Sequence, residues 1–280
     1  PDESWLVARG WGQLLLSADH PERALEFVAQ YKPAADAHPT DRIDWHLLMG
    51  GALMRLGMHA EAREHFAALQ GGPSADLAEL ALARLSVAEG RPEEALERLD
   101  KGGFRARLSA QDLAGWHALA GEARLLAGDP SAALGELEAA LELTDTWEQA
   151  TYGEAETTAR NVMGEWQGLH TVALLAWAHA RLGQPLDALA AIEDSQSRSL
   201  RHLDAELARV RAASGLAAGR EVVTPGEVLT WARHAELGLV TWVVGADFTV
   251  TTWVGPEEAG GESRMRTQAQ RIEIGRRRLD

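Results

Sequence analysis

A repeating pattern of small and large apolar residues runs along most of this chain. A glycine is followed five positions later by an alanine, and a bulky apolar residue comes four positions after that, as in Gly57, Ala62 and Phe66. Residues four apart lie on one face of a helix, so the pattern predicts a turn at the glycine and then a helix that buries the other two residues. The further copies are Gly90, Ala95 and Leu99; Gly128, Ala133 and Leu137; and Gly183, Ala188 and Ile192, with Asp19 and Ala24 in the first two slots near the start.

The segment before the glycine repeats as well: Trp45-His46, Gly50 and Ala52 are matched by Trp116-His117, Gly121 and Ala123. Together these positions resemble the tetratricopeptide repeat (TPR), a helical hairpin of about 34 residues. The resemblance covers about Trp5 to Ser195 and implies about five hairpins in a right-handed helical solenoid. In such a solenoid small residues let the two helices of a hairpin approach, and large residues fill the gap to the next hairpin.

The last repeat interval, between Gly128 and Gly183, is longer than the others. It holds a polar segment at 144–164 that is rich in Glu and Thr, where we expect a long loop or an inserted helix. The composition changes after the repeats. We therefore expect TPR-like repeats over 1–195, a connecting helix over 196–222, and a small α/β segment over 223–280. The expected fold class is mainly α, a TPR-like right-handed helical solenoid followed by this α/β segment.

The α/β segment begins with a helix-start signal, Thr224-Pro225-Gly226-Glu227, which has Thr at the cap and Pro at the first helical position. Two runs of β-type residues follow at 237–244 and 248–254, and the short connection between them predicts a β-hairpin. Residues 255–261 are expected to form a loop. From Glu262 we expect a last helix.

That last helix is expected because Met265, Ala269 and Ile272 fall on one helical face, with arginines around them. The first β-type run places apolar residues on both of its faces, so both faces are expected to be buried. An isolated two-stranded hairpin is only marginally stable in water. An open strand edge invites pairing. We therefore expect additional strands beside the 237–254 hairpin, supplied by sequence beyond Asp280 or by a second chain.

The order of elements after the repeats resembles the entry into a CHAT domain, a caspase-like, separase-related cysteine protease domain that follows TPR arrays in bacteria. The stretches that carry this resemblance are Arg198-Ser199-Leu200 and the tryptophan-bearing runs at 237–244 and 248–254. It implies that 223–280 is an incomplete start of such a domain. The catalytic histidine and cysteine of the family lie downstream of the hairpin, so no catalytic residue can be assigned in this chain.

Composition and charge exclude several classes of function. An apolar fraction of 46% and a charged fraction of 25% are ordinary globular values, so the chain is not disordered as a whole. The net charge of −15 argues against nucleic-acid binding. The absence of cysteine excludes disulfides, cysteine-ligated metal sites and a cysteine nucleophile within these residues. No apolar run reaches membrane-spanning length, and no secretory signal is evident, so we expect a cytoplasmic protein.

The sequence contains no motif that predicts a cofactor or a metal site. The chain has only two lysines, neither of which follows a glycine-rich turn, so it has no phosphate-binding P-loop. Its histidines never form the His-x-x-x-His pair with a glutamate that marks a metalloprotease helix. The histidines of the repeat helices, His46 and His117 among them, are interpreted as packing or surface residues.

TPR arrays bind proteins along a concave face made by the first helix of each hairpin, so the resemblance implies a protein partner. The positions expected on that face are Arg9, Gln13, Leu16, Asp44, Leu47, Gly51, Met54, Leu80, Arg84, Val87, Ala118, Glu122, Leu125, His170, Ala173, Trp177 and Ala180. The contact is expected to centre on Met54, Arg84, Glu122 and Trp177. The lysine and asparagine clamp by which some TPRs hold a terminal carboxylate is excluded, because those residue types are almost missing.

Two hypotheses remain from the sequence. The chain is either the regulatory and scaffold part of a TPR–CHAT protease, holding a partner or its own protease domain, or a non-enzymatic TPR adaptor or sensor subunit. Whether the full-length protein is a cysteine peptidase depends on a histidine and a cysteine encoded after Asp280.

Overall fold

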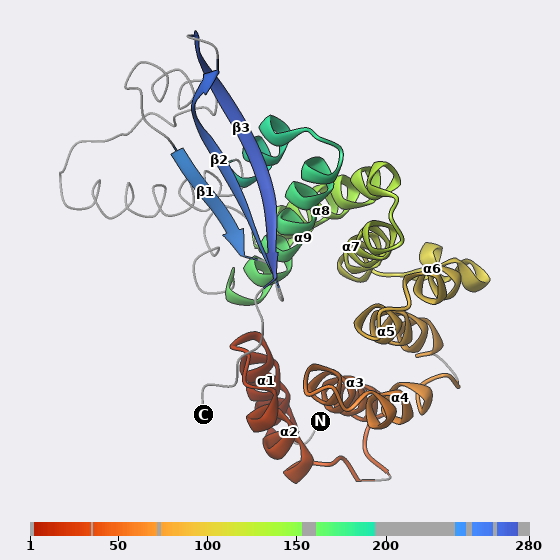
Figure 1. The fold of residues 1–280 in the computed structure, drawn as a ribbon. Coiled ribbons are helices and arrows are strands. Elements are labelled where there is room, and N and C mark those ends of the chain that lie inside the picture. The colour runs from red at the N-terminus through yellow and green to blue at the C-terminus, as the bar shows by residue number, and fades with distance from the viewer. Residues whose placement is uncertain are drawn as a thin grey trace, which may run out of the picture. The chain divides into compact units, whose positions relative to one another are not determined.

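The computed structural model describes residues 3–34, 36–71, 74–152, 161–193, 239–244, 248–259 and 262–273 (Figure 1). The chain forms two compact units, Pro1–Gly128 and Asp129–Asp280. The expected connecting helix at 196–222 and the helix start at Thr224 lie outside the described residues.

The first unit is built from antiparallel helical hairpins. Its helices are α1 (Glu3–Ser17), α2 (Pro21–Gln30), α3 (Pro39–Arg55), α4 (His59–Ala67), α5 (Ala75–Ala88), α6 (Pro92–Asp100), the 3₁₀ helix η1 (Lys101–Arg107) and α7 (Ala110–Leu126). Each α-helix contacts the next one along the chain, and α1 contacts α3, α3 contacts α5 and α5 contacts α7. This is the neighbour-to-neighbour stacking of TPR-like repeats.

The turns inside the hairpins lie where the sequence pattern predicts them. Gly57, Gly90 and Gly128 have φ values of 74°, 71° and 88°, in the left-handed region that glycine adopts without strain. The Met58 N–H then donates to the Leu53 carbonyl at 2.9 Å, which closes the end of α3 in a Schellman-type turn. Asp19 adopts the same left-handed conformation with a φ of 56°, so its assignment to the glycine slot is confirmed.

The alanines and large residues of the pattern form the core of each hairpin. Ala62 and Ala95 are fully buried, and Phe66 and Leu99 are 3% and 2% exposed. A Cβ atom added to Gly50 would lie only 2.3 Å from Phe66 Cε1, and one added to Gly12 only 2.6 Å from Val28 Cγ2. These glycines therefore let the first helix of a hairpin lie directly against the large residue of the second.

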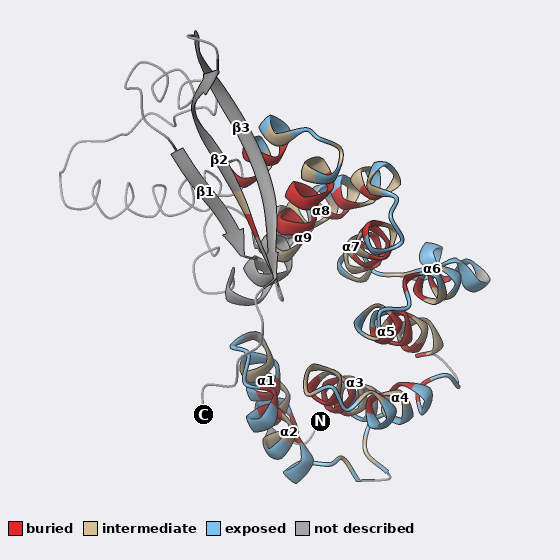
Figure 2. Cartoon of the chain, viewed as in Figure 1, coloured by how far each residue is buried: buried red, intermediate tan, exposed pale blue. Residues whose placement is uncertain are grey.

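Buried tryptophans join consecutive hairpins. Trp45 Nε1 on α3 donates to the carbonyl of Val28 on α2 at 3.2 Å. Trp116 Nε1 on α7 donates in the same way to the carbonyl of Leu99 on α6, also at 3.2 Å. In both cases the acceptor belongs to the large residue of the preceding hairpin. The repeat pattern is thus reproduced in hydrogen bonding as well as in packing, and Figure 2 shows the buried positions along α3, α5 and α7.

The second unit combines helices with a small sheet. It contains α8 (Pro130–Tyr152), α9 (Asn161–Arg181), a helical segment at 185–193, and the strands β1 (Leu239–Val244), β2 (Phe248–Ala259) and β3 (Glu262–Glu273). The sheet is antiparallel with the order β1-β2-β3. Helix α9 contacts α8 and all three strands, and residues 171–178 of α9 are buried without interruption. A helix enclosed on two sides has no solvent-facing stripe, which explains this run.

The expected β-hairpin is confirmed, but the expected last helix is wrong. Residues 262–273 form β3, which pairs with β2 along its whole length, and residues 255–259, expected in a loop, continue β2. Met265 and Ala269 are four residues apart, a spacing that places them on one face of a helix and also on one face of a strand. Residues 262–273 form a strand because they pair with β2, and the local sequence pattern does not reveal this pairing.

Two further expectations change with the structure. The additional strand beside β2 comes from this chain's own residues 262–273 and not from sequence beyond Asp280 or from a second chain. A further strand on the other edge of β1 stays a prediction. The polar segment at 144–164 is also no separate element in its described part, because residues 144–152 continue α8 and residues 161–164 begin α9.

The close approach at Gly50 gives a stability prediction with a neighbouring control. Gly50→Ala places a methyl group against the Phe66 ring and should destabilise the fold by about 1–3 kcal/mol, even though alanine is the better helix former. At Gly51, one residue further, the nearest atom to an added Cβ is Leu16 Cδ1 at 3.8 Å. Gly51→Ala should therefore stabilise the fold by roughly 0.5–1 kcal/mol. Urea unfolding of both variants measures the difference, and equal effects would contradict the packing described.

Candidate protein-binding surface

Arg84 occupies a position that repeats along the first helices of the hairpins. It lies on α5, six residues before Gly90, and Glu122 lies on α7, six residues before Gly128. A Cβ added to Gly115 of α7 would lie 3.9 Å from Arg84 Nη2, so the guanidinium extends toward the neighbouring hairpin. We define the Arg84 surface by Met54 on α3, Arg84 on α5 and Glu122 on α7.

The electrostatic environment of Arg84 is unusual for an exposed side chain. Its side chain is accessible to solvent, yet the protein on either side of it desolvates the guanidinium and lowers the pKa of Arg84. Glu122 opposes this lowering, Arg55 of α3 adds to it, and Asp112 of α7 opposes it. An arginine side chain stays charged at neutral pH even when its pKa is lowered in this way.

Other arginines of the first unit join neighbouring helices through ion pairs. Arg9 Nη1 on α1 lies 2.9 Å from Asp44 Oδ2 on α3, and Arg63 Nη2 on α4 lies 2.7 Å from Glu89 Oε2 after α5. Arg9 and Asp44, both expected on the binding face, are therefore bound to each other. Arg84 differs, since it forms no hydrogen bond or ion pair with any described residue.

The other expected contact residues are placed differently. Met54 is half-buried against the cluster that contains Phe66 and Leu85, and Glu122 is half-buried. Trp177 lies on α9 in the second unit, is only 7% exposed, and has the Arg181 guanidinium carbon 6.0 Å from its ring centre. The structure thus brings Arg84 and Glu122 together in one unit, whereas Trp177 has little surface left for a partner.

A cluster of two histidines over a tryptophan lies between α3 and α4. The ring centres of His46 and His65 are 5.2 Å apart, and they lie 5.0 and 5.2 Å from that of Trp45. Lys32 Nζ lies 5.4 Å from the centre of the Trp45 ring. The Nδ1 atoms of both histidines are buried and have no hydrogen-bond partner among the described residues. His65 could not be found from the sequence, because it lies on the next helix and belongs to no motif.

Burial lowers the pKa of both histidines. For His46 the further causes are His65, Lys32 and Arg42, all of which oppose a second positive charge. For His65 burial is again the largest cause, Glu64 opposes it, and Lys32 adds to it. The pair is therefore held neutral at pH 7. His117 has a different environment, since its Nε2 lies 3.1 Å from Arg105 Nη2.

Two other features are absent from the parts of the chain that the structure describes. No group of three or more potential metal ligands comes together there. In the same ranges, no helix combines the length and the apolar character needed to cross a membrane.

Comparison with known proteins shows a likeness to a solved structure. No family model and no curated protein matches the chain. Among solved structures it is similar to a crystal structure of nearly identical TPR-like repeats, described as kinesin light chain, from Podosopora anserina. The sequence identity is 21%, the TM-score is 0.45, and the alignment covers 71% of this chain and 95% of that one.

The histidine pair gives a pH prediction. The folded pKa of each histidine lies below the ordinary value of 6.5, so between these values the unfolded chain binds more protons than the folded chain. The free energy of unfolding should therefore fall as the pH drops below about 6.5. Urea unfolding between neutral and mildly acidic pH measures this loss. His65→Gln should reduce it, whereas His20→Gln at an exposed position should not, and identical pH profiles for both would contradict the assignment.

Proposed function

We propose that this chain is a protein-binding scaffold whose Arg84 surface holds an acidic group of a partner protein. The observation that carries the proposal is the exposed Arg84 side chain, whose guanidinium is desolvated by the surrounding protein and has no hydrogen-bond or ion-pair partner among the described residues. An arginine in such a place gains more from a carboxylate than one that is fully hydrated, because its hydration is already incomplete. Planar guanidinium groups bind carboxylates through two parallel hydrogen bonds.

Apolar residues around Arg84 specify the rest of the partner. Met54 on α3 and Val87 on α5 occupy the same repeat position, three residues before their glycines, and both are half-buried. Leu47 on α3 is also half-buried and packs against the neighbouring core. This combination suits an amphipathic helix that presents its apolar face and one carboxylate. The net charge of −15 disfavours a partner that is acidic throughout.

Charge reversal tests this proposal. Arg84→Glu should reduce capture of the partner at least tenfold, while Arg23→Glu, the same charge change at an exposed position on α2, should leave capture unchanged. Capture is quantified by mass spectrometry, and a peptide from the captured protein is then titrated against both variants. Replacing the acidic residue of that peptide by its amide should abolish the difference between them.

Folding must be separated from binding in this experiment. Because Arg84 has no bonded partner among the described residues, Arg84→Met should leave the melting temperature unchanged or raise it, which shows that lost binding is not lost folding. Equal capture by the Arg84→Glu and Arg23→Glu proteins would refute the proposed site.

A second candidate function is the regulatory part of a TPR–CHAT protease. The observation that favours it is the hairpin of β1 and β2, which carries Trp242 and Trp253 in a unit that begins with TPR-like helices. The strand β3 departs from the helix that the resemblance implied at this place. Since residues 1–280 contain no cysteine, a nucleophile would have to come from outside them. The reading frame after Asp280 tests this candidate, which requires a histidine and a cysteine at strand ends there.

A further inference from the structure

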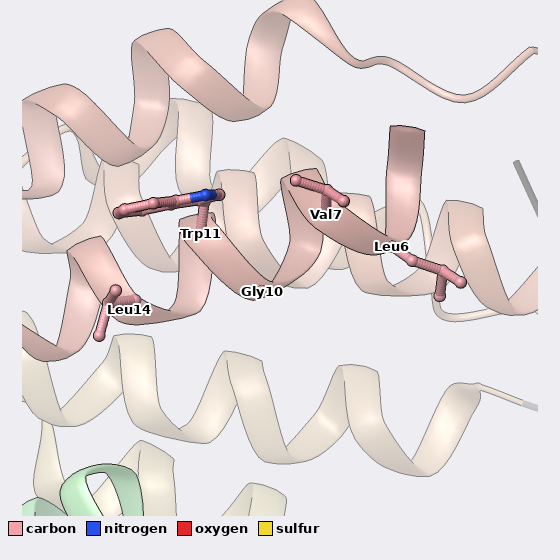
Figure 3. A pocket seen from close by; sticks show the side chains of 5 residues that line it. All are labelled: Leu6, Val7, Gly10, Trp11 and Leu14. Atoms are coloured by element: carbon pink, nitrogen blue, oxygen red, sulfur yellow. The ribbon is translucent and has the colours of Figure 1, made fainter. Parts of the chain in front are cut away.

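Helix α1 exposes a row of apolar side chains that no described residue covers. Leu6, Val7, Trp11 and Leu14 are 43%, 59%, 52% and 41% exposed, and with Gly10 they line a shallow pocket on the helix (Figure 3). An exposed apolar patch of this kind on a charged protein marks an interaction site.

The same repeat positions are buried in the later hairpins. Val7, Trp11 and Leu14 lie twelve, eight and five residues before the turn residue Asp19, as Trp45, Met49 and Ala52 lie before Gly57. In α3 these residues are 8%, 9% and 1% exposed, and Trp45 and Met49 belong to the cluster that joins α3 to α1 and α2. The corresponding residues Ala78, Leu82 and Leu85 of α5 and Trp116, Ala120 and Ala123 of α7 are buried too. The exposed face of α1 is therefore the face by which a hairpin packs on its neighbour.

The face also carries the complementary half of such a contact. In the second helix of the first hairpin, Val28 belongs to the core cluster that also holds Trp45 and Met49 of the next hairpin, and it follows the small residue Ala24 by four positions. Gly10 and Leu14 reproduce this spacing on α1. A Cβ added to Gly10 would meet nothing within 4 Å, whereas Gly12 and Gly50 face large side chains of their own hairpins. Gly10 thus leaves a notch beside the bulky Trp11, and one face holds both a recess and a protrusion.

We infer that α1 of one copy of this chain packs antiparallel on α1 of a second copy, across a two-fold axis near Gly10. In such an isologous contact the Trp11 ring of each copy covers Gly10 of the partner subunit. Helix α1 contains one acidic and one basic residue, Glu3 and Arg9, so it is neutral on a chain whose net charge is −15. Repulsion between two copies is therefore smaller through this helix than the charge of the whole surface would give.

The oligomeric state of the full chain tests the inference. Sedimentation of the wild type up to about 100 µM should show a monomer–dimer equilibrium, as expected of a small interface. Gly10→Glu should weaken dimerisation at least tenfold, because it fills the notch with a charge, and it should not lower the melting temperature, because the added atoms meet nothing in the monomer. Met58→Glu is the matched control, since Met58 is 40% exposed elsewhere on the same unit.

Cross-linking locates the contact. The chain has no cysteine, so Gly10→Cys introduces a single thiol close to the proposed axis. Under mild oxidation it should yield a disulfide-linked dimer, and Met58→Cys should not. A wild type that stays monomeric at all concentrations would overturn the inference, as would a dimer that Gly10→Glu leaves intact. The first result would leave the face to another protein.

Discussion

The distance at which two helices of a hairpin can approach is the constraint on which the repeat architecture depends. A residue without a side chain on the first helix faces a large residue on the second, as at Gly50 and Phe66, and the left-handed turn at Gly57 brings the two into register. When the helices lie this close, a tryptophan of one hairpin can reach the backbone carbonyl of the large residue in the preceding hairpin, as Trp45 reaches Val28. Packing within a hairpin and hydrogen bonding between hairpins are therefore consequences of the same spacing.

The features that the sequence could predict are those decided by neighbours along the chain. The glycine slot was recognisable even where Asp19 fills it, because helix termination and the burial of Ala24 depend on residues within one hairpin. The strand at 262–273 was not recognisable, since its apolar spacing suits two structures and a ladder with β2 selects one. Trp177 matches Arg84 in repeat position, yet it is buried because α9 also packs on the sheet, which the repeat pattern does not encode.

The Arg84 surface and the exposed face of α1 differ from comparable residues elsewhere in the first unit. Arg9 and Arg63 are held by carboxylates of other helices or their ends, whereas Arg84 forms no hydrogen bond or ion pair with a described residue. The face that later hairpins bury against their neighbours is open on α1. For the α1 face the repeats supply an internal reference, because the equivalent residues of α3, α5 and α7 are buried. This makes the face stronger evidence for a ligand than exposure or charge alone.

The nearest-neighbour contacts of the first unit also determine how it comes apart. The main contacts of each hairpin are with the adjacent ones, so the stability of the unit is a sum of terms for single hairpins and terms for the junctions between them. The hairpin of α1 and α2 has a single described junction, with α3, and should exchange its amide protons faster than the hairpin of α5 and α6, which is held on both sides. The first unit should therefore open locally from one end. Such an opening should stop at a junction where a tryptophan donates a hydrogen bond to the preceding hairpin.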